Sequence, residues 1–394
     1  MAAEDVQQRT GGTTSPAAPG RITSLDWVRG WLLVVSVAVN SLWAAPAWFG
    51  HAPWAGVHPV DLVFPVFATL SGCGLGFALR RRVAASPLVR RVLVLLVAGL
   101  LYNAVTSGRW DVGTWRLTGV LQLYAVVVVA LSLGHLLTRT WRGWALLTAC
   151  LAAAHTALLS AWGAGCPGGE LTAGCNPSGA VDPALLGAAH VYGQGALGHD
   201  PEGVVAVAGA LVSAAAGATV AHLLLRLRGA PGRGPPLLVL LVLALAAGLL
   251  GVGVLAGSLP PLLGGADVPA MKRLWTAPFA LPVAAGVALA LLAGHVLLDR
   301  PATGAVLRGA SWPLVALGRN SLLVYFGSHV LTAVLGRADA ADPAAPAPDE
   351  RAGAALAGAL GLGEHPQVVW TVALVVAWTA LACVLHARRL YLRP

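Results

Sequence analysis

The stretch that decides the fold is SLDWVRGWLLVVSVAVNSLWAAPAWFGHAPWAGVHPVDLVFPVFATLSGCGLGFALRRR, residues 24–82. It consists of two apolar runs joined by a polar turn. Asn40 lies deep inside the first run, His51 lies in the turn beyond Pro46, and Asp61 opens the second run. Polar groups at such a depth cost free energy unless they have partners, so these three side chains mark a candidate site near one membrane face.

The composition is that of a membrane protein. Of the 394 residues, 57% are hydrophobic and 10% are charged, and the mean hydropathy is +0.75. These values exclude an ordinary soluble domain. Because about 20 apolar residues cross a bilayer, we predict an all-α, polytopic integral membrane helical bundle. Ten spans are expected, and they lie near 27–48, 60–79, 91–106, 117–137, 143–162, 203–225, 237–257, 274–297, 312–335 and 368–386. An eleventh helix at 352–363 is an alternative that the sequence leaves open.

The charged residues divide unequally between the two sides that these spans define. With the N-terminus in the cytoplasm, only six of the 25 basic residues fall on the outer side, together with 12 of the 16 acidic residues. The positive-inside rule therefore predicts a cell-membrane protein with both termini in the cytoplasm and His51 on the extracytoplasmic side. The net charge of +9 then reflects topology and contact with membrane lipid, and no nucleic-acid partner is expected.

The chain is expected to form one domain. Residues 1–22 predict a disordered cytoplasmic tail, and residues 23–394 a single transmembrane domain with extracytoplasmic loops at 163–202 and 336–367, the second of them flexible. Cys166 and Cys175 share the first loop and can pair if it faces an oxidising compartment. Glycine-rich runs at 72–76 and 209–217 predict close helix packing and permit a homodimer.

The residues around the polar turn resemble a known family. The pattern SLDxxRG at 24–30, then Asn40, then HAPWxGxxxxDLVFPxF at 51–67 is similar to the heparan-α-glucosaminide N-acetyltransferase family, a branch of the transmembrane acyltransferases. The resemblance covers roughly residues 21–390, although Thr118, Leu123 and Pro183 depart from the family pattern. Its other similar segments are Arg116–Gln122, Cys166-Pro167, Leu185-Leu186-Gly187, His190-Val-Tyr192, Asp200-Pro-Glu-Gly203, Leu274-Trp275-Thr276 and Asn320–Tyr325.

The resemblance implies a membrane-embedded acyltransferase. Such an enzyme moves an acetyl group from acetyl-CoA on the cytoplasmic side to an extracytoplasmic acceptor, a sugar amine or hydroxyl. Acetyl-CoA is then the co-substrate, and the acceptor is a glycan or a small molecule. No metal-ligand spacing is found in the sequence, and a metal is not expected.

His51 is the first candidate for the chemistry. Histidine side chains titrate at about pH 6.5, so a neutral imidazole can accept a proton from a hydroxyl or an amine. It can also attack a thioester and carry the acyl group transiently. The alternative is a histidine at the membrane interface within an aromatic belt that includes Trp48 and Trp54.

Asn40 and Asp61 each have two interpretations. Asn40 either holds the reacting carbonyl or orients His51, as the resemblance implies, or it is a polar contact between helices. Asp61 follows Pro59 at the start of the second span, where a carboxylate can cap the helix and is favoured by the helix dipole. It can also orient His51 or bind the acceptor, and both roles can hold at once.

The remaining candidates are assigned to the two substrates. Arginines near the cytoplasmic side can hold the phosphates of coenzyme A, although topology alone explains most of them. The predicted coenzyme A contacts are Arg29, Arg80, Arg81, Gln122, Asn320 and Tyr325, and the predicted acceptor contacts are Trp54, His190, Asp200 and Glu202. For Asp200, capping of the following span is the competing interpretation.

Two other classes of function compete with the enzyme. A transporter or permease would use His51 and Asp61 to relay protons, but transporters commonly have repeated halves, and the sequence has no convincing internal repeat. A membrane scaffold that has lost catalysis is the third interpretation, and the intact His51 and Asn40 argue against it.

Overall fold

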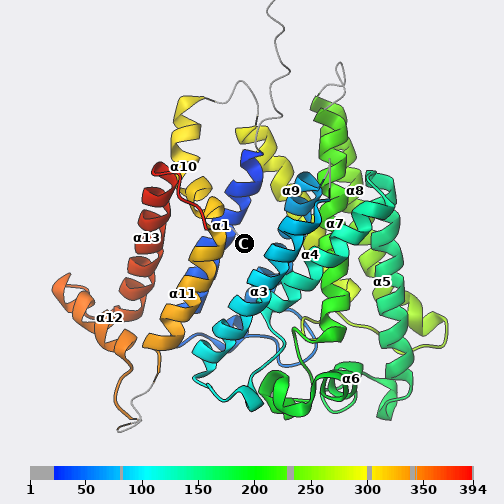
Figure 1. The fold of residues 1–394 in the computed structure, drawn as a ribbon, viewed down its shortest axis with the longest axis horizontal. Helices are drawn as coiled ribbons and strands as arrows, with labels where there is room; N and C mark the ends of the chain where they lie inside the picture. The colour runs from blue at the N-terminus through cyan, green and yellow to red at the C-terminus, as the bar shows by residue number, and fades with distance from the viewer. Residues whose placement is uncertain are drawn as a thin grey trace, which may run out of the picture.

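A computed structural model describes residues 22–79, 83–228, 235–299, 304–337, 342 and 344–392. The predicted N-terminal tail, apart from Ile22, and Arg80 and Arg81 lie outside these residues. The described part is built of helices that run roughly parallel in one bundle (Figure 1). The longer helices are α1 (Thr23–Asn40), α2 (Val63–Ala78), α3 (Ala85–Ser107), α4 (Val120–Leu137), α5 (Trp141–Ala164), α7 (Val204–Arg228), α8 (Pro235–Leu262), α9 (Ala277–Leu298), α10 (Ala305–Arg319), α11 (Ser321–Leu335) and α13 (Pro366–Ala387).

Eight helices in the described residues are long and apolar enough to cross a membrane. The predicted class, an all-α polytopic membrane bundle, is therefore confirmed. The two other predicted spans correspond to α1, which carries Asp26 and Arg29, and to the pair α10 and α11. The prediction of one continuous span at 312–335 is wrong, because Asn320 leaves helical geometry (φ −107°, ψ 24°) and separates the two helices.

The predicted first span, 27–48, is too long. Helix α1 ends at Asn40, where the hydroxyl of Ser41 donates a hydrogen bond to the carbonyl of Ala38 (2.8 Å). Serine and asparagine compete with the helix by such local hydrogen bonds and often end it. Asn40 therefore lies at the end of α1 rather than deep within a span.

Helix α7 is at the centre of the bundle. Its span is 78% buried, whereas those of α8 and α13 are 22% and 17% buried. A helix that is apolar all round must lie either in a protein core or in lipid. The central position belongs to α7, which packs against α2 and α5, and the outer helices present their apolar surfaces to the membrane.

The two ends of the bundle differ. Helix α6 (Pro177–Leu186) and helix α12 (Pro348–Ala359) lie at the lower end in Figure 1, and the start of α1 and the end of α7 lie at the upper end. The predicted loop 163–202 folds around α6 and a series of short 3₁₀ helices: Pro167–Gly169, Ala188–His190 and Tyr192–Gly195. Helix α12 occupies part of the second loop, which was predicted to be flexible, and its 12 residues rise only about 18 Å, too little to span a bilayer.

Helices α2 and α7 approach each other through glycines, as the glycine-rich runs predict. A Cβ atom at Gly72 would lie 1.9 Å from the carbonyl oxygen of Ala214, and one at Gly217 would lie 2.0 Å from that of Thr69. Small residues at such crossings let two backbones come close enough for dense packing in lipid. This crossing fixes α2, and the candidate site lies in the segment directly before that helix.

We expect Gly72→Leu to destabilise the protein by about 1–3 kcal/mol or more, because the new side chain meets backbone rather than a movable side chain. The thermal unfolding of the detergent-solubilised protein measures the effect. Gly286→Leu is the matched control, since the glycine of α9 has open space around its Cβ position. Equal unfolding temperatures for the two variants would contradict a tight α2–α7 crossing.

Candidate functional site

His51 and Asp61 form a hydrogen-bonded pair at the lower end of the bundle. The chain leaves α1, makes a 3₁₀ turn at Ala47–Phe49 and enters a second one at Pro59–Leu62, directly before α2. This path brings Nδ1 of His51 to 2.7 Å from Oδ1 of Asp61. The histidine side chain is 46% exposed and the aspartate 1% exposed. The predicted neighbours therefore meet, with a buried carboxylate beneath a solvent-accessible imidazole.

Asp61 also organises the loop that carries His51. Its second oxygen accepts hydrogen bonds from the backbone amides of His58 (2.9 Å) and Ala52 (3.2 Å). The first of these contacts caps the 3₁₀ turn that leads into α2, which is the structural role expected for a carboxylate at this position. One carboxylate thus caps the turn and contacts the imidazole, and the predicted part of Asp61 in the chemistry stays a prediction.

A third charged group reaches the pair from a distant part of the chain. Gly56 bridges to Met271, and its amide donates to the carbonyl of Ala270 (3.0 Å). The bridge places Nζ of Lys272 3.2 Å from Nδ1 and 3.4 Å from Nε2 of His51, and 3.8 Å from Oδ1 of Asp61. In the sequence, Lys272 is one of the six basic residues expected on the outer side, and no role was predicted for it. One signal could have found it, since Lys272 is the only lysine in the chain.

The environment of Lys272 acts on its charge in opposite directions. Burial lowers the pKa of the Lys272 ammonium, and the neighbouring Arg273 lowers it further, whereas the carboxylates of Glu202 and Asp61 raise it. Burial prevails, so the pKa lies below the ordinary lysine value. Arg273 supports the loop itself, because its guanidinium donates to the carbonyl of Ala52 (3.2 Å).

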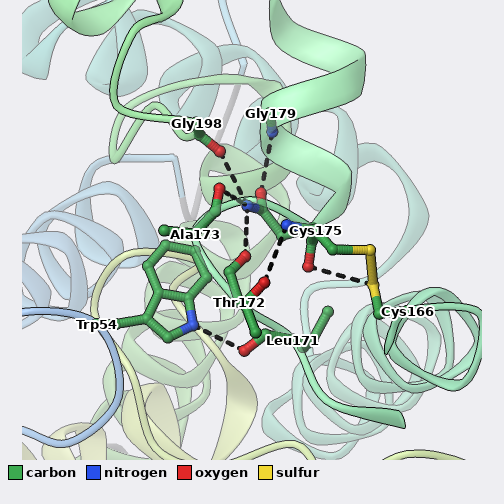
Figure 2. Close-up of a disulfide and its surroundings, with 9 residues drawn as sticks. Trp54, Cys166, Leu171, Thr172, Ala173, Cys175, Gly179 and Gly198 are labelled. Carbon is green, nitrogen blue, oxygen red and sulfur yellow. Dashed lines mark hydrogen bonds between the residues drawn. A yellow bond between two sulfur atoms is a disulfide. The ribbon is translucent and has the colours of Figure 1, made fainter. Parts of the chain in front are cut away.

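Trp54 links the loop that carries His51 to the loop that contains Cys166 and Cys175. Its indole nitrogen donates to the carbonyl of Leu171 (2.8 Å), as Figure 2 shows. Cys166 and Cys175 form the disulfide that their shared loop made possible. The ring of Trp54 also meets that of His199 edge to face, with 5.4 Å between centroids. The indole N–H of Trp54 thus has a partner within the protein. A contact between Trp54 and an acceptor stays a prediction, and it would have to be made by the face of the ring.

Asp200 and Glu202 converge on Arg116. One guanidinium nitrogen of Arg116 lies 2.6 Å from a carboxylate oxygen of each. Burial alone would lower the pKa of Arg116, but the two carboxylates raise it above the ordinary value. Asp200 is 1% exposed and also accepts from the hydroxyl of Thr118 (2.5 Å) and from the amide of Tyr192 (2.8 Å).

The neighbouring contacts complete this network. Asp182, rather than Asp200, caps α7, since its carboxylate accepts from the amide of Val204 (2.7 Å). His190 bonds to the carbonyl of Trp115 through Nδ1 (2.7 Å). The geometry therefore assigns internal partners to His190, Asp200 and Glu202, and their predicted contacts with an acceptor stay predictions.

A cavity of about 340 Å³ opens among the helices on the other side of the pair. Arg29, Arg91 and Arg319 line one part of it, and Phe64, Phe67 and Tyr325 line another. Phe64 lies three residues after Asp61, so the cavity comes close to the His51–Asp61 pair. His51 itself does not line the cavity. Ligand sites in proteins typically measure about 300–1,000 Å³, and the buried Nε of Arg91 has no hydrogen-bond partner among the described residues.

The cavity separates the predicted coenzyme A contacts into two groups. Arg29 and Tyr325 line it, whereas Gln122 and Asn320 are buried between helices beside it. The side chain of Gln122 packs against Gly99 and Gly119, and that of Asn320 donates to the carbonyl of Ala316 (3.0 Å). Arg91, which sequence reasoning left to topology, joins the lining, and an exposed neighbour at position 90 does not.

The arrangement suits acid–base chemistry at one nitrogen. With Nδ1 of His51 bonded to Asp61, a neutral ring would carry its proton on Nδ1 and leave Nε2 as the basic nitrogen, with Nζ of Lys272 3.4 Å from it. Asn40 is half-buried at the end of α1, and its predicted role in holding a carbonyl stays a prediction. The fold and the pair define the class: a polytopic helical membrane protein with a histidine–carboxylate site at one end of the bundle.

Comparison with known proteins finds a family to which part of this chain is similar. Residues 21–166 match the family described as heparan-alpha-glucosaminide N-acetyltransferase, catalytic. The human heparan-alpha-glucosaminide N-acetyltransferase is 25% identical over 372 residues, which cover 80% of this chain and 53% of the human protein. Both matches support the predicted family, and the matched segment contains Asn40, His51 and Asp61. The chain spans about half the length of this relative.

We expect Arg116→Gln to destabilise the outer loops by about 3 kcal/mol, because it removes the cationic partner of a buried carboxylate. Limited proteolysis of the 163–202 loop and thermal unfolding in detergent measure the loss. Arg109→Gln, a change at an exposed arginine of the same segment, should leave both unchanged. Unaltered stability of Arg116→Gln would show that Asp200 does not depend on this guanidinium.

Proposed function

We propose that the protein is a membrane acyltransferase that transfers an acetyl group from acetyl-CoA to an acceptor amine or hydroxyl. The observation that carries the proposal is the His51–Asp61 pair directly before α2, whose first residues Phe64 and Phe67 line a cavity that arginines also line. His51 can act as a base toward the acceptor, and the arginines of the cavity can bind the phosphates of acetyl-CoA, so each substrate of such a reaction has a group that suits it. The name of the human relative and the matched family support the same chemistry.

The donor enters the cavity from the end with the arginines. Arg29, Arg91 and Arg319 hold the phosphates by charge-assisted hydrogen bonds, and the narrow pantetheine arm extends between the helices toward Phe64. The predicted topology makes this the cytoplasmic side, because the positive-inside rule places the arginine-rich ends of the helices there. The acceptor then arrives from the extracytoplasmic side, where His51 is exposed.

His51 acts as the general base. Its Nε2 takes the proton from the acceptor amine or hydroxyl while the acceptor atom bonds to the thioester carbonyl carbon. The carbon–sulfur bond breaks as the tetrahedral adduct collapses, and the sulfur of coenzyme A leaves as a thiol with the proton that Nε2 returns. Asp61 holds the ring and stabilises the imidazolium formed midway. Nε2 can instead take the acetyl group itself before the acceptor does, and Asn40 is assigned to the carbonyl oxygen in either route.

The acceptor is proposed as a sugar or a small molecule with an exposed amine or hydroxyl. Trp54 offers an aromatic face beside His51, and Glu202 offers a carboxylate that is 11% exposed. The alternative function, a permease that moves protons through His51 and Asp61, predicts neither donor binding nor transfer. It therefore differs from the enzyme in two measurements.

We expect His51→Ala to abolish acetyl transfer, with a loss of at least about 100-fold. This is the lower end of the rate contribution that a general base typically makes. The assay follows release of free thiol from acetyl-CoA in proteoliposomes, with glucosamine as the acceptor. His365→Ala, a change at an exposed histidine of another loop, is the control. Retained transfer by a folded, inserted His51→Ala protein would remove His51 from the mechanism.

We expect Arg91→Gln to weaken acetyl-CoA binding roughly tenfold, because it removes charge-assisted hydrogen bonds to phosphate. Titration calorimetry on the purified protein gives the dissociation constant directly. Arg90→Gln changes the exposed arginine beside it and should bind as the unaltered protein does. A protein that binds no acetyl-CoA at all would support the permease instead.

A further inference from the structure

The sole lysine of the chain stands beside both ring nitrogens of His51. The other 24 basic residues are arginines, yet the one position with a lysine places its Nζ 3.2 Å from Nδ1 and 3.4 Å from Nε2. The ammonium of lysine is a compact charge on a flexible stem, whereas the guanidinium of arginine is a wide planar fork. A compact charge can lie beside the hydrogen-bonded pair, against the imidazole and 3.8 Å from the buried carboxylate of Asp61.

The backbone fixes this lysine in place. The amide of Trp275 donates to the carbonyl of Lys272 (2.9 Å), and Trp275 itself has a φ of 50°, in the left-handed region that bulky residues rarely adopt. Its indole is 1% exposed and donates to the hydroxyl of Ser213 on α7 (3.0 Å). Strain of this kind persists only where the surrounding structure enforces it, and it is concentrated at functional sites.

We propose that Lys272 is a positioning residue that keeps His51 neutral and ready to accept a proton. The inference rests on the proposed function, in which Nε2 of His51 is the base. The ammonium offsets the negative charge of Asp61, so the carboxylate does not draw a second proton onto the imidazole. It also stands close enough to repel the imidazolium, which favours return of the proton to the leaving sulfur.

The charges around the pair agree with this role. With Asp61 ionised and Lys272 protonated, a neutral imidazole leaves the three groups without net charge. The other titratable or charged side chains of the surrounding segments contact neighbours of the ring or act on Lys272 from a distance. They are His58, which bonds to the carbonyl of Gly50, Arg273, which bonds to that of Ala52, His199, which faces Arg273, and Glu202, which acts on Lys272.

Without the ammonium of Lys272, the ionised carboxylate of Asp61 favours a protonated His51, and the two form an ion pair. We therefore expect Lys272→Met to move the acidic limb of the pH–rate profile upward by about one pH unit or more, which is a tenfold change in the fraction of active base. Activity at neutral pH falls, and part of it returns as the pH is raised. Lys272→Arg retains the charge and should keep the limb within a few tenths of a unit of the unaltered protein.

A second measurement reports on His51 without any substrate. Diethyl pyrocarbonate modifies neutral imidazoles, and peptide mass spectrometry follows the modification of His51 as a function of pH. The exposed His365 of the same molecule serves as the internal standard. The midpoint for His51 should rise in Lys272→Met and stay in Lys272→Arg. Arg351→Met, which removes a charge from the exposed face of α12, should behave as the unaltered protein does.

These two measurements separate the inference from the proposed function. Absence of acetyl transfer by the unaltered protein would overturn the function, while the modification midpoint would still test Lys272. A midpoint unchanged by Lys272→Met, or raised equally by Lys272→Arg, would overturn the inference. So would acetylation of Lys272 during turnover, because it would make the lysine an acyl carrier. Thermal unfolding verifies the fold of each variant, and Lys272→Gln takes the place of a methionine variant that does not fold.

Discussion

The end of the bundle that carries the loop between α1 and α2 depends on the burial of one carboxylate. Asp61 is 1% exposed and accepts hydrogen bonds from the ring of His51 and from the amides of Ala52 and His58, with Lys272 nearby. A buried carboxylate is costly unless donors and a cation surround it. The loop between α1 and α2 therefore folds around Asp61, and the orientation of His51 is a consequence of satisfying that charge.

The same solution occurs a second time in the outer region. Asp200 is as deeply buried as Asp61, and it receives Arg116 from another part of the chain, as Asp61 receives Lys272. In both places a carboxylate on one segment requires a cation from a segment far away in sequence. These pairs hold together loops that have no sheet between them among the described residues.

The sequence determines most of the architecture because apolar length and periodicity are local properties. The predicted spans recover the helices, and the glycine runs recover the crossing of α2 and α7. The pairing of His51 with Asp61 was also foreseeable, since ten residues separate them. The contact with Lys272 was not, because it needs the bridge between Gly56 and Met271, across more than 200 residues. The early end of α1 at Asn40 was missed because apolar composition continues beyond the helix.

The separation between cavity and imidazole follows from the aromatic residues at the start of α2. Phe64 packs against Tyr325, Tyr124 and Trp275, with ring centroids 6.0–6.5 Å apart. Phe64, Tyr124 and Tyr325 line the cavity, whereas Trp275 lies three residues after Lys272. Under the proposed function, a thioester arm in the cavity would have to pass Phe64, the ring of this cluster nearest in sequence to Asp61, to reach His51. The segment that orients the base in this proposal thus also carries the ring that the donor arm would have to pass.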